Sequence, residues 1–125
     1  MGRSGLKFSL DVERLKRSMK LMFVLFRRAD LTHEQSLTEW TGAPHRLIAQ
    51  SVPGLKKWVQ NRVISLPNEN AADGIGELWF DSQEAMEHAM SSPQMAAAVE
   101  DAKRFLDMER TYAVVVTEET VTVNM

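Results

Sequence analysis

The sequence predicts an α+β protein with a ferredoxin-like fold, in which two split β-α-β units form a four-stranded antiparallel sheet with helices on one face only. Two observations lead to this prediction. Strand-length apolar runs and segments of helical periodicity follow one another in the order β-α-β, β-α-β. The first and last strand-like runs, residues 21–26 and 112–117, are apolar on both faces, which is typical of strands that are covered on both sides.

The first unit begins with the strand at residues 21–26 and continues into a helix. Thr32 and Gln35 have the spacing of a capping box, which predicts that the helix starts at this point. Gly42 and Pro44 interrupt the helical pattern. Because proline removes a backbone donor and clashes with the preceding turn, we expect a kink or a break near the middle of this helix.

Two strands are expected next, at about residues 55–64 and 74–80, joined by a polar linker that is rich in turn-forming residues. Asp81 followed three residues later by Glu84 predicts a capping box and the start of a second helix. Ser92-Pro93 combines a capping residue with a proline at the first helical position. A new helical segment is therefore expected from this point, so the second helix is in two pieces.

Residues 112–117 form the last expected strand, and Val121 and Val123 alternate with polar residues in the tail that follows. Residues 1–18 do not continue the sheet pattern. We predict that they form an N-terminal extension, either flexible or a short amphipathic helix, and that residues 19–125 form the folded domain.

The predicted sheet has more apolar surface than its own helices can cover. Helices on one face leave the other face bare, and a monomer would then expose an apolar patch of many hundreds of Å². A second copy of the same sheet is the simplest cover. The sequence therefore predicts a homodimer through the open sheet face, closed with two-fold symmetry into a dimeric α/β barrel.

Composition excludes several classes of protein. The 125 residues carry a formal net charge of −2 with both signs interspersed, which gives no pull toward nucleic acid or an anionic membrane. There is no cysteine, so disulfides, thiolate nucleophiles and cysteine metal sites are excluded. The longest apolar run is too short to span a bilayer and no leader pattern is present. We expect a soluble, cytoplasmic protein without a cofactor or a metal ion.

Glu77 is the first candidate for chemistry, because it places a carboxylate in an otherwise apolar strand. Alternation puts it on one face with Ile75 and Trp79, away from the helices and toward the space between two sheets. As a general acid or base it would have a pKa raised toward neutrality by desolvation. The alternative is an ion pair with Arg62 or another residue of the barrel.

Several segments resemble the EthD-domain family, and the likeness covers roughly residues 20–118. They are Val52-Pro53-Gly54-Leu55 running into Trp58-Val59-Gln60-Asn61, the run Asp73-Gly74-Ile75-Gly76-Glu77-Leu78-Trp79-Phe80-Asp81-Ser82, and Phe105-Leu106-Asp107. His45, eight residues before Pro53, stands where that family usually carries its histidine. The resemblance implies the same dimeric α/β barrel. EthD itself is associated with ether degradation, without a settled reaction.

His45 is the histidine that the resemblance places near a pocket. An imidazole titrates near neutrality without any perturbation, so His45 is a candidate general base. The alternative is a histidine at a helix end that is satisfied by a backbone carbonyl. We expect His33 and His88 to lie at the surface, and their spacing matches no metal motif.

Six further residues are candidates for substrate binding. Aromatic side chains at strand spacing could line a pocket for a flat compound, although such residues more often only fill the core. Amide side chains could orient a carbonyl, or satisfy backbone groups of the hairpin. These candidates are Phe23, Trp58, Trp79, Tyr112, Gln60 and Asn61. Alternation puts Gln60 and Asn61 on opposite faces, so both reach one pocket only if the strand contains a bulge.

The function that these residues support is a small, cofactor-free enzyme of the EthD type. It would act by proton transfer through His45 and Glu77 on a hydrophobic, oxygenated small molecule, as an isomerase, a decarboxylase or cyclase, or a degradation-pathway enzyme. The alternative is a non-catalytic barrel protein that binds a small molecule, or haem held by His45, with a stress-related or accessory role.

Overall fold

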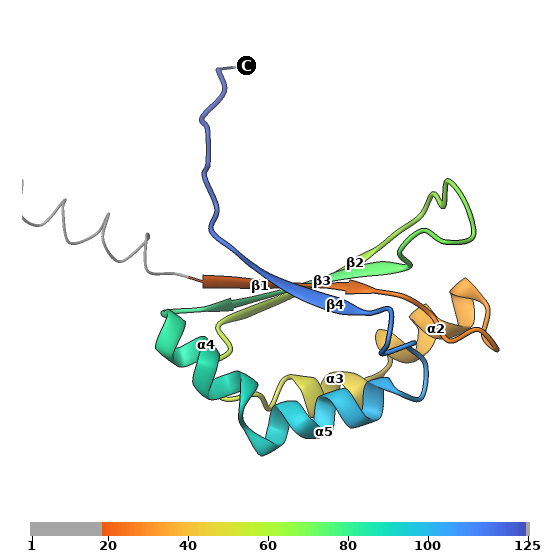
Figure 1. The fold of residues 1–125 in the computed structure, drawn as a ribbon. Helices are drawn as coiled ribbons and strands as arrows, with labels where there is room; N and C mark the ends of the chain where they lie inside the picture. Colours follow the sequence, from red (N-terminus) through yellow and green to blue (C-terminus); the bar gives the residue numbers. More distant parts are fainter. Residues whose placement is uncertain (1–18, 125) are drawn as a thin grey trace, which may run out of the picture.

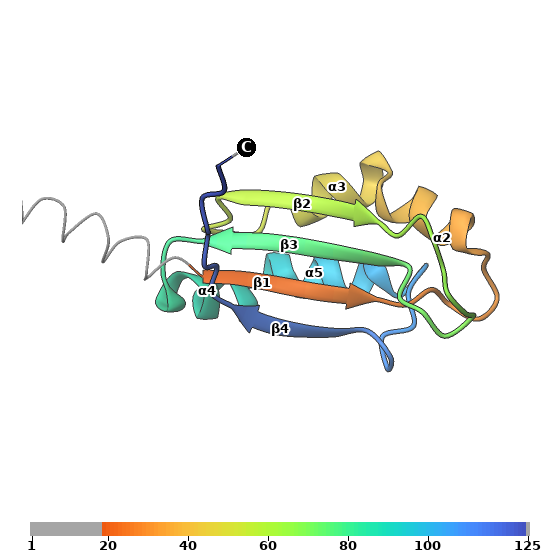
Figure 2. The same ribbon diagram turned by 90° about the horizontal axis from the view of Figure 1, so that it is seen from above.

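A computed structural model describes residues 19–124 of the chain. The elements are β1 (Met19–Leu25), α2 (His33–Trp40), α3 (Ala43–Ala49), β2 (Lys57–Arg62), β3 (Gly74–Phe80), α4 (Gln83–Met90), α5 (Pro93–Ala102) and β4 (Tyr112–Val116). The strands form one antiparallel sheet in the order β2-β3-β1-β4 (Figure 2). This is the ferredoxin-like α+β fold that the sequence predicts.

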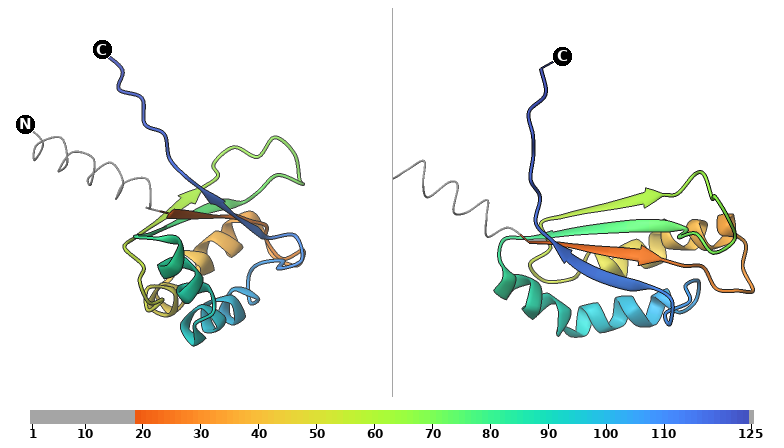
Figure 3. Two further views of the ribbon diagram at one scale, coloured as in Figure 1. Left: turned by 60° about the vertical axis from the view of Figure 1, so that its left-hand side comes forward. Right: turned by 45° about the horizontal axis from the view of Figure 1, so that its top comes forward.

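All four described helices pack on one face of the sheet, and the other face carries none (Figure 1). The views of Figure 3 show the same two layers. In β3 the residues alternate between buried and half-buried positions: Leu78 and Phe80 face the helices, whereas Glu77 and Trp79 face the open side. The main core therefore lies between the helices and the sheet, where Phe80 and Phe105 are completely buried.

The helix starts follow local capping chemistry. The capping box at Thr32 and Gln35 is confirmed, and so is the Ser92 cap of α5. The break predicted around Gly42 and Pro44 is also confirmed, because α2 ends at Trp40 and α3 begins at Ala43. The box expected at Asp81 is wrong by one residue. The N-cap of α4 is Ser82, whose hydroxyl accepts the Ala85 N–H.

The strand ends differ from the sequence pattern in two places. The second strand is shorter than the expected range 55–64, because β2 pairs with β3 only from Lys57 to Arg62. The alternation of Val121 and Val123 does not form a strand, and both side chains are exposed. Figure 1 shows this tail leaving β4 on the open side of the sheet. The predicted N-terminal extension, residues 1–18, lies outside the described residues.

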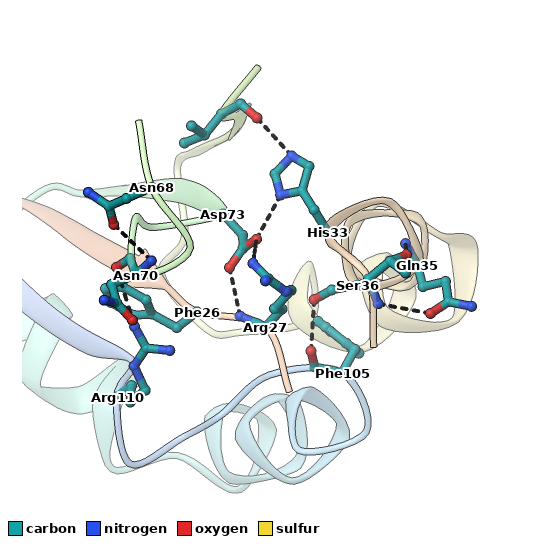
Figure 4. Close-up of polar contacts among 12 residues, drawn as sticks. Phe26, Arg27, His33, Gln35, Ser36, Asn68, Asn70, Asp73, Phe105 and Arg110 are labelled. Carbon is teal, nitrogen blue, oxygen red and sulfur yellow. Dashed lines mark hydrogen bonds and ion pairs between the residues drawn. The ribbon is translucent and has the colours of Figure 1, made fainter. Parts of the chain in front are cut away.

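A buried carboxylate joins the end of β1 to the start of α2 and β3 (Figure 4). Asp73 is 1 % exposed and accepts hydrogen bonds from the Arg27 backbone N–H at 2.8 Å and from the Arg27 guanidinium at 3.1 Å. His33 Nδ1 lies 2.7 Å from Asp73 Oδ1, and His33 Nε2 lies 2.9 Å from the Val63 carbonyl oxygen. The prediction that His33 lies at the surface is therefore wrong, since it fastens the β2–β3 loop to α2.

Candidate functional site

A cavity of about 70 Å³ lies between the sheet and the helices. Its wall is almost entirely apolar, and its aromatic members are Phe23 from β1, Trp40 from α2 and Trp58 from β2. The polar side chains in the wall are those of His45 and Thr111. The wall is therefore mostly apolar with few polar atoms, and those polar atoms decide the chemistry, as is usual for small-molecule sites.

His45 reaches this cavity because α3 starts again after the break at Gly42 and turns the third residue of the helix inward. The His45 ring is 6 % exposed and lies edge-on to Phe105 and Trp58, with ring centroids 5.0 Å and 6.4 Å away. Its Nδ1 lies 2.9 Å from Asp101 Oδ2. Because an ionised carboxylate only accepts hydrogen bonds, Nδ1 carries the proton and Nε2 keeps a lone pair.

Within residues 19–124 the hydrogen bond of His45 uses Nδ1, and Nε2 has no partner. Because no buried side-chain nitrogen or oxygen among these residues lacks a partner, Nε2 is accessible and not fully buried. It is therefore the polar atom that the ring can offer to a molecule in the cavity. The arrangement is similar to the carboxylate–histidine pairs of hydrolases, in which the carboxylate fixes the tautomer and the orientation of the imidazole. The alternative of a histidine satisfied by a backbone carbonyl does not hold, because the partner of His45 is a side-chain carboxylate.

Asp101 is itself held in place by a chain of charges on the outside of the fold. Arg104 donates to both of its oxygens, at 2.7 Å and 3.1 Å, and also to Glu39 at 3.0 Å. The hydrogen bond from Arg104 lowers the pKa of Asp101, with a further contribution from His45. Asp101 thus stays ionised at neutral pH and presents a fixed carboxylate to the imidazole.

Burial lowers the pKa of His45 below its ordinary value, and the hydrogen bond and charge of Asp101 oppose this effect only in part. The imidazole is therefore neutral at neutral pH. A neutral imidazole with its proton on Nδ1 is the form that can accept a proton at Nε2.

Glu77 lies on the opposite side of the sheet from His45. One of its oxygens accepts a hydrogen bond from Lys20 at 2.9 Å and the other from Asn61 at 2.9 Å. These hydrogen bonds, first that of Asn61 and then that of Lys20, lower the pKa of Glu77. The expectation of a raised pKa is therefore wrong. The ion pair expected as the alternative is present, but the partner of Glu77 is Lys20. Arg62 contacts Thr41 and Glu34 instead.

The other predicted binding residues divide between the two faces. Phe23 and Trp58 line the cavity. Gln60 lies on the same side, but its side chain is bonded to the Trp40 carbonyl oxygen and to Arg46. The opposite orientation of Gln60 and Asn61 is as predicted from alternation. The open face carries Asn61, Trp79 and Tyr112.

Two residues of the site, Asp101 and Thr111, were not predicted from the sequence. Asp101 was missed, although its spacing of three residues from Ala98 and four from Phe105 puts it at the edge of the buried stripe of α5. Thr111 was also missed, because it lies in the connection before β4. His88 is exposed, as predicted.

Within the part of the chain that is described, no three histidine or acidic side chains are grouped so that they could hold a metal ion. No described helix has the length and apolar character needed to cross a membrane.

Solved structures with the same fold come from several bacteria. An EthD family protein from Bacillus halodurans is 21% identical with a TM-score of 0.66, covering 82% of this chain and 99% of its own. A dimeric ferredoxin-like protein of unknown function from Thermobifida fusca is 16% identical with a TM-score of 0.59, covering 82% and 92%. The cofactor-independent oxygenase SnoaB from Streptomyces nogalater is 8% identical with a TM-score of 0.56, covering 84% and 96%.

A search of the curated proteins found no match. The EthD domain profile, in contrast, matches residues 28–109, which include both His45 and Asp101. This match spans well over half of the chain, and the fold is the one shared with the Bacillus halodurans protein. The chain therefore belongs to the EthD family.

Proposed function

We propose that this protein is a small enzyme that needs no cofactor and transfers a proton on a hydrophobic, oxygenated small molecule. The observation that carries the proposal is the His45–Asp101 pair at the wall of an apolar cavity. A second support is that a protein of the same fold, SnoaB, is described as a cofactor-independent oxygenase.

His45 acts as the general base in this proposal. Its Nε2 takes a proton from an O–H group, or from a C–H group next to a carbonyl, and returns it to another atom of the substrate. The imidazolium that forms is stabilised by the Asp101 carboxylate at 2.9 Å. Arg104 positions Asp101 from outside the cavity. Isomerisation, cyclisation and decarboxylation all include such a proton step.

Glu77 takes no part in this step, because the sheet separates it from the cavity. We assign to it the structural role of an ion pair with Lys20 on the open face. A carboxylate whose oxygens are both bonded has less capacity left for a substrate.

We further propose that the chain forms a homodimer through the open face of its sheet. Apolar side chains of this face, such as Val114 and Tyr112 of β4, are exposed in the single chain. Three proteins of the same fold are described as dimeric. In a dimer of this kind the Glu77–Lys20 pair would lie between the two sheets and help to fix their register.

The size of the cavity argues against haem held by His45, which the sequence leaves open. Pockets for drug-sized ligands measure about 300–1,000 Å³, and the cavity beside His45 is about 70 Å³. An absorption spectrum of the purified protein without a Soret band would agree with this conclusion.

Deuterium uptake at the α-carbons of cyclopentanone, followed by proton NMR in deuterium oxide, tests the proton transfer with a small neutral ketone. We expect wild-type protein to accelerate the uptake and His45→Gln to lower the protein-dependent rate by at least about 100-fold, the typical contribution of a positioned base. Glu77→Gln is the matched control and should keep most of the rate. Equal rates for wild type and His45→Gln would leave only a binding function for the cavity.

A further inference from the structure

The wall of the cavity contains no charged residue. Every lining side chain is apolar except for those of His45 and Thr111, and the former is neutral at neutral pH. Asp101, the charged partner of His45, is itself paired with Arg104. A ligand that enters with its own charge would therefore find no opposite charge in the wall, which makes its burial costly.

Thr111 supplies the second polar atom of the cavity. Its Oγ1 accepts the backbone N–H of Phe26 at 3.1 Å, and its own backbone N–H donates to the Asp107 carbonyl at 2.9 Å. These bonds fix the hydroxyl oxygen in place. The hydroxyl hydrogen donates to no residue between 19 and 124, so it is free to donate to a ligand.

We propose that the cavity selects a neutral ligand that combines an acidic hydrogen with a hydrogen-bond acceptor, held between His45 Nε2 and the Thr111 hydroxyl. The inference rests on the proposed function and names its substrate class: small enolisable ketones, enols or phenols. At about 10–15 Å³ for each water-sized volume, a cavity of about 70 Å³ holds only a small ring or chain unless Met95 and Met108 move aside. Methionine side chains adapt readily in this way.

The proton transfer balances within this pair of contacts. The substrate O–H or C–H bond breaks, its hydrogen forms a bond to Nε2, and the electron pair stays on the substrate as a phenolate or enolate. The Thr111 hydroxyl donates to the oxygen that gains the negative charge. Both charges arise together inside the cavity as an imidazolium–enolate pair, so no isolated charge is ever buried. Free carboxylic acids, which enter as anions, are excluded, and this favours isomerisation or cyclisation over decarboxylation.

Binding of three ring compounds of similar size tests this inference: phenol, benzene and benzoate, titrated calorimetrically above neutral pH. Phenol should bind more tightly than benzene, and benzoate at least about 100-fold more weakly than phenol because its charge is unpaired in the cavity. Thr111→Val should lower the phenol affinity about fivefold relative to benzene, the typical effect of one hydrogen bond. Thr111→Ser, which keeps the hydroxyl, should restore the ratio.

Thr111→Val also removes the acceptor of the Phe26 N–H, which can disturb the cavity for every ligand. The readout is therefore the ratio of phenol to benzene affinity, because such a general disturbance affects both ligands. If that variant does not fold, the phenol–benzoate comparison on wild type decides. Benzoate binding as tightly as phenol, no binding of phenol, or an unchanged ratio in Thr111→Val would each overturn the inference. The two proposals can fail independently. An unchanged rate of deuterium uptake in His45→Gln would refute the catalytic function. Tight benzoate binding would refute only the proposed ligand class.

Discussion

The two faces of the sheet hold ionisable groups in opposite states. On the helix side, His45 is desolvated, is fixed through one nitrogen and keeps the other without a partner among the described residues. On the open side, Glu77 has both oxygens bonded and a lowered pKa. Both residues stand out in the sequence, yet only His45 combines a fixed orientation with unused bonding capacity. A perturbed pKa therefore marks a candidate catalytic group only when the group still has an atom to offer.

On the helix side, we expect the largest effect on the rate of deuterium uptake from a substitution of Asp101. Asp101→Asn keeps the shape but lets the imidazole adopt the wrong tautomer, and we expect the rate of deuterium uptake to fall by about 10²-fold or more. The measurement is the pH profile of this rate, because loss of the carboxylate also shifts the protonation of His45. Asn61→Ala, which removes a comparable partner from Glu77 on the open side, is the control. Equal rates in wild type and Asp101→Asn would contradict the assigned role.

On the open side the largest effect should be on assembly. Val114→Asp puts an unpaired carboxylate into the proposed sheet–sheet interface, and we expect dimer dissociation constants to rise by more than about 100-fold. Sedimentation velocity measures the change, and Val114→Thr, of similar volume and without charge, should stay dimeric. A wild-type protein that sediments as a monomer at micromolar concentration would refute the dimer itself.

Stability should depend on pH through the helix side. His45 has a folded-state pKa below its ordinary value of 6.5, so the unfolded chain binds the extra proton first. The free energy of unfolding should therefore decrease as pH falls below about 6.5, by up to about 1.4 kcal/mol per pH unit until the folded-state pKa is reached. Urea titrations of wild type and His45→Gln at several pH values isolate this contribution, since the variant lacks it. Parallel curves for the two proteins would contradict the lowered pKa.

The smallest effect is expected for removal of residues 1–18, which the sequence separates from the domain. The melting temperature should change by less than about 8 °C, which corresponds to roughly 2 kcal/mol for a domain of this size. Differential scanning calorimetry of the full chain and of residues 19–125 makes the comparison. A larger decrease would mean that the extension belongs to the folded core.

Local patterns predicted the fold because they act over a few residues. The Thr32 box, the break around Gly42 and the Ser92 cap each depend on neighbours within one helical turn, and all three are confirmed. The cap of α4 was misplaced because Asp81 and Ser82 are adjacent capping residues, and only the backbone geometry decides between them.

The candidate site was only partly predictable, because its contacts join distant parts of the chain. His45 and Asp101 are 56 positions apart, and Lys20 and Glu77 are 57 apart. Without the strand register, the sequence could suggest an ion pair for Glu77 but could not identify Lys20 as its partner. Likewise His33 looked like a surface residue, because its partner Asp73 is 40 positions away. Alternation placed Glu77 on the correct face, but it could not say which residues of neighbouring strands lie beside it.

Two glycines of β3, Gly74 and Gly76, differ in the space that they leave for a side chain, and this decides which of them could be changed to alter the size of the cavity. A methyl group at Gly74 would lie 2.8 Å from the Trp40 ring, so this position admits no side chain unless the indole moves. At Gly76 the nearest atom of the same ring is 3.4 Å away, an ordinary contact. Gly76→Ala should therefore fold and fill part of the cavity from the sheet side. A strand position without a side chain thus offers the simplest route by which evolution or engineering could alter the capacity of this site.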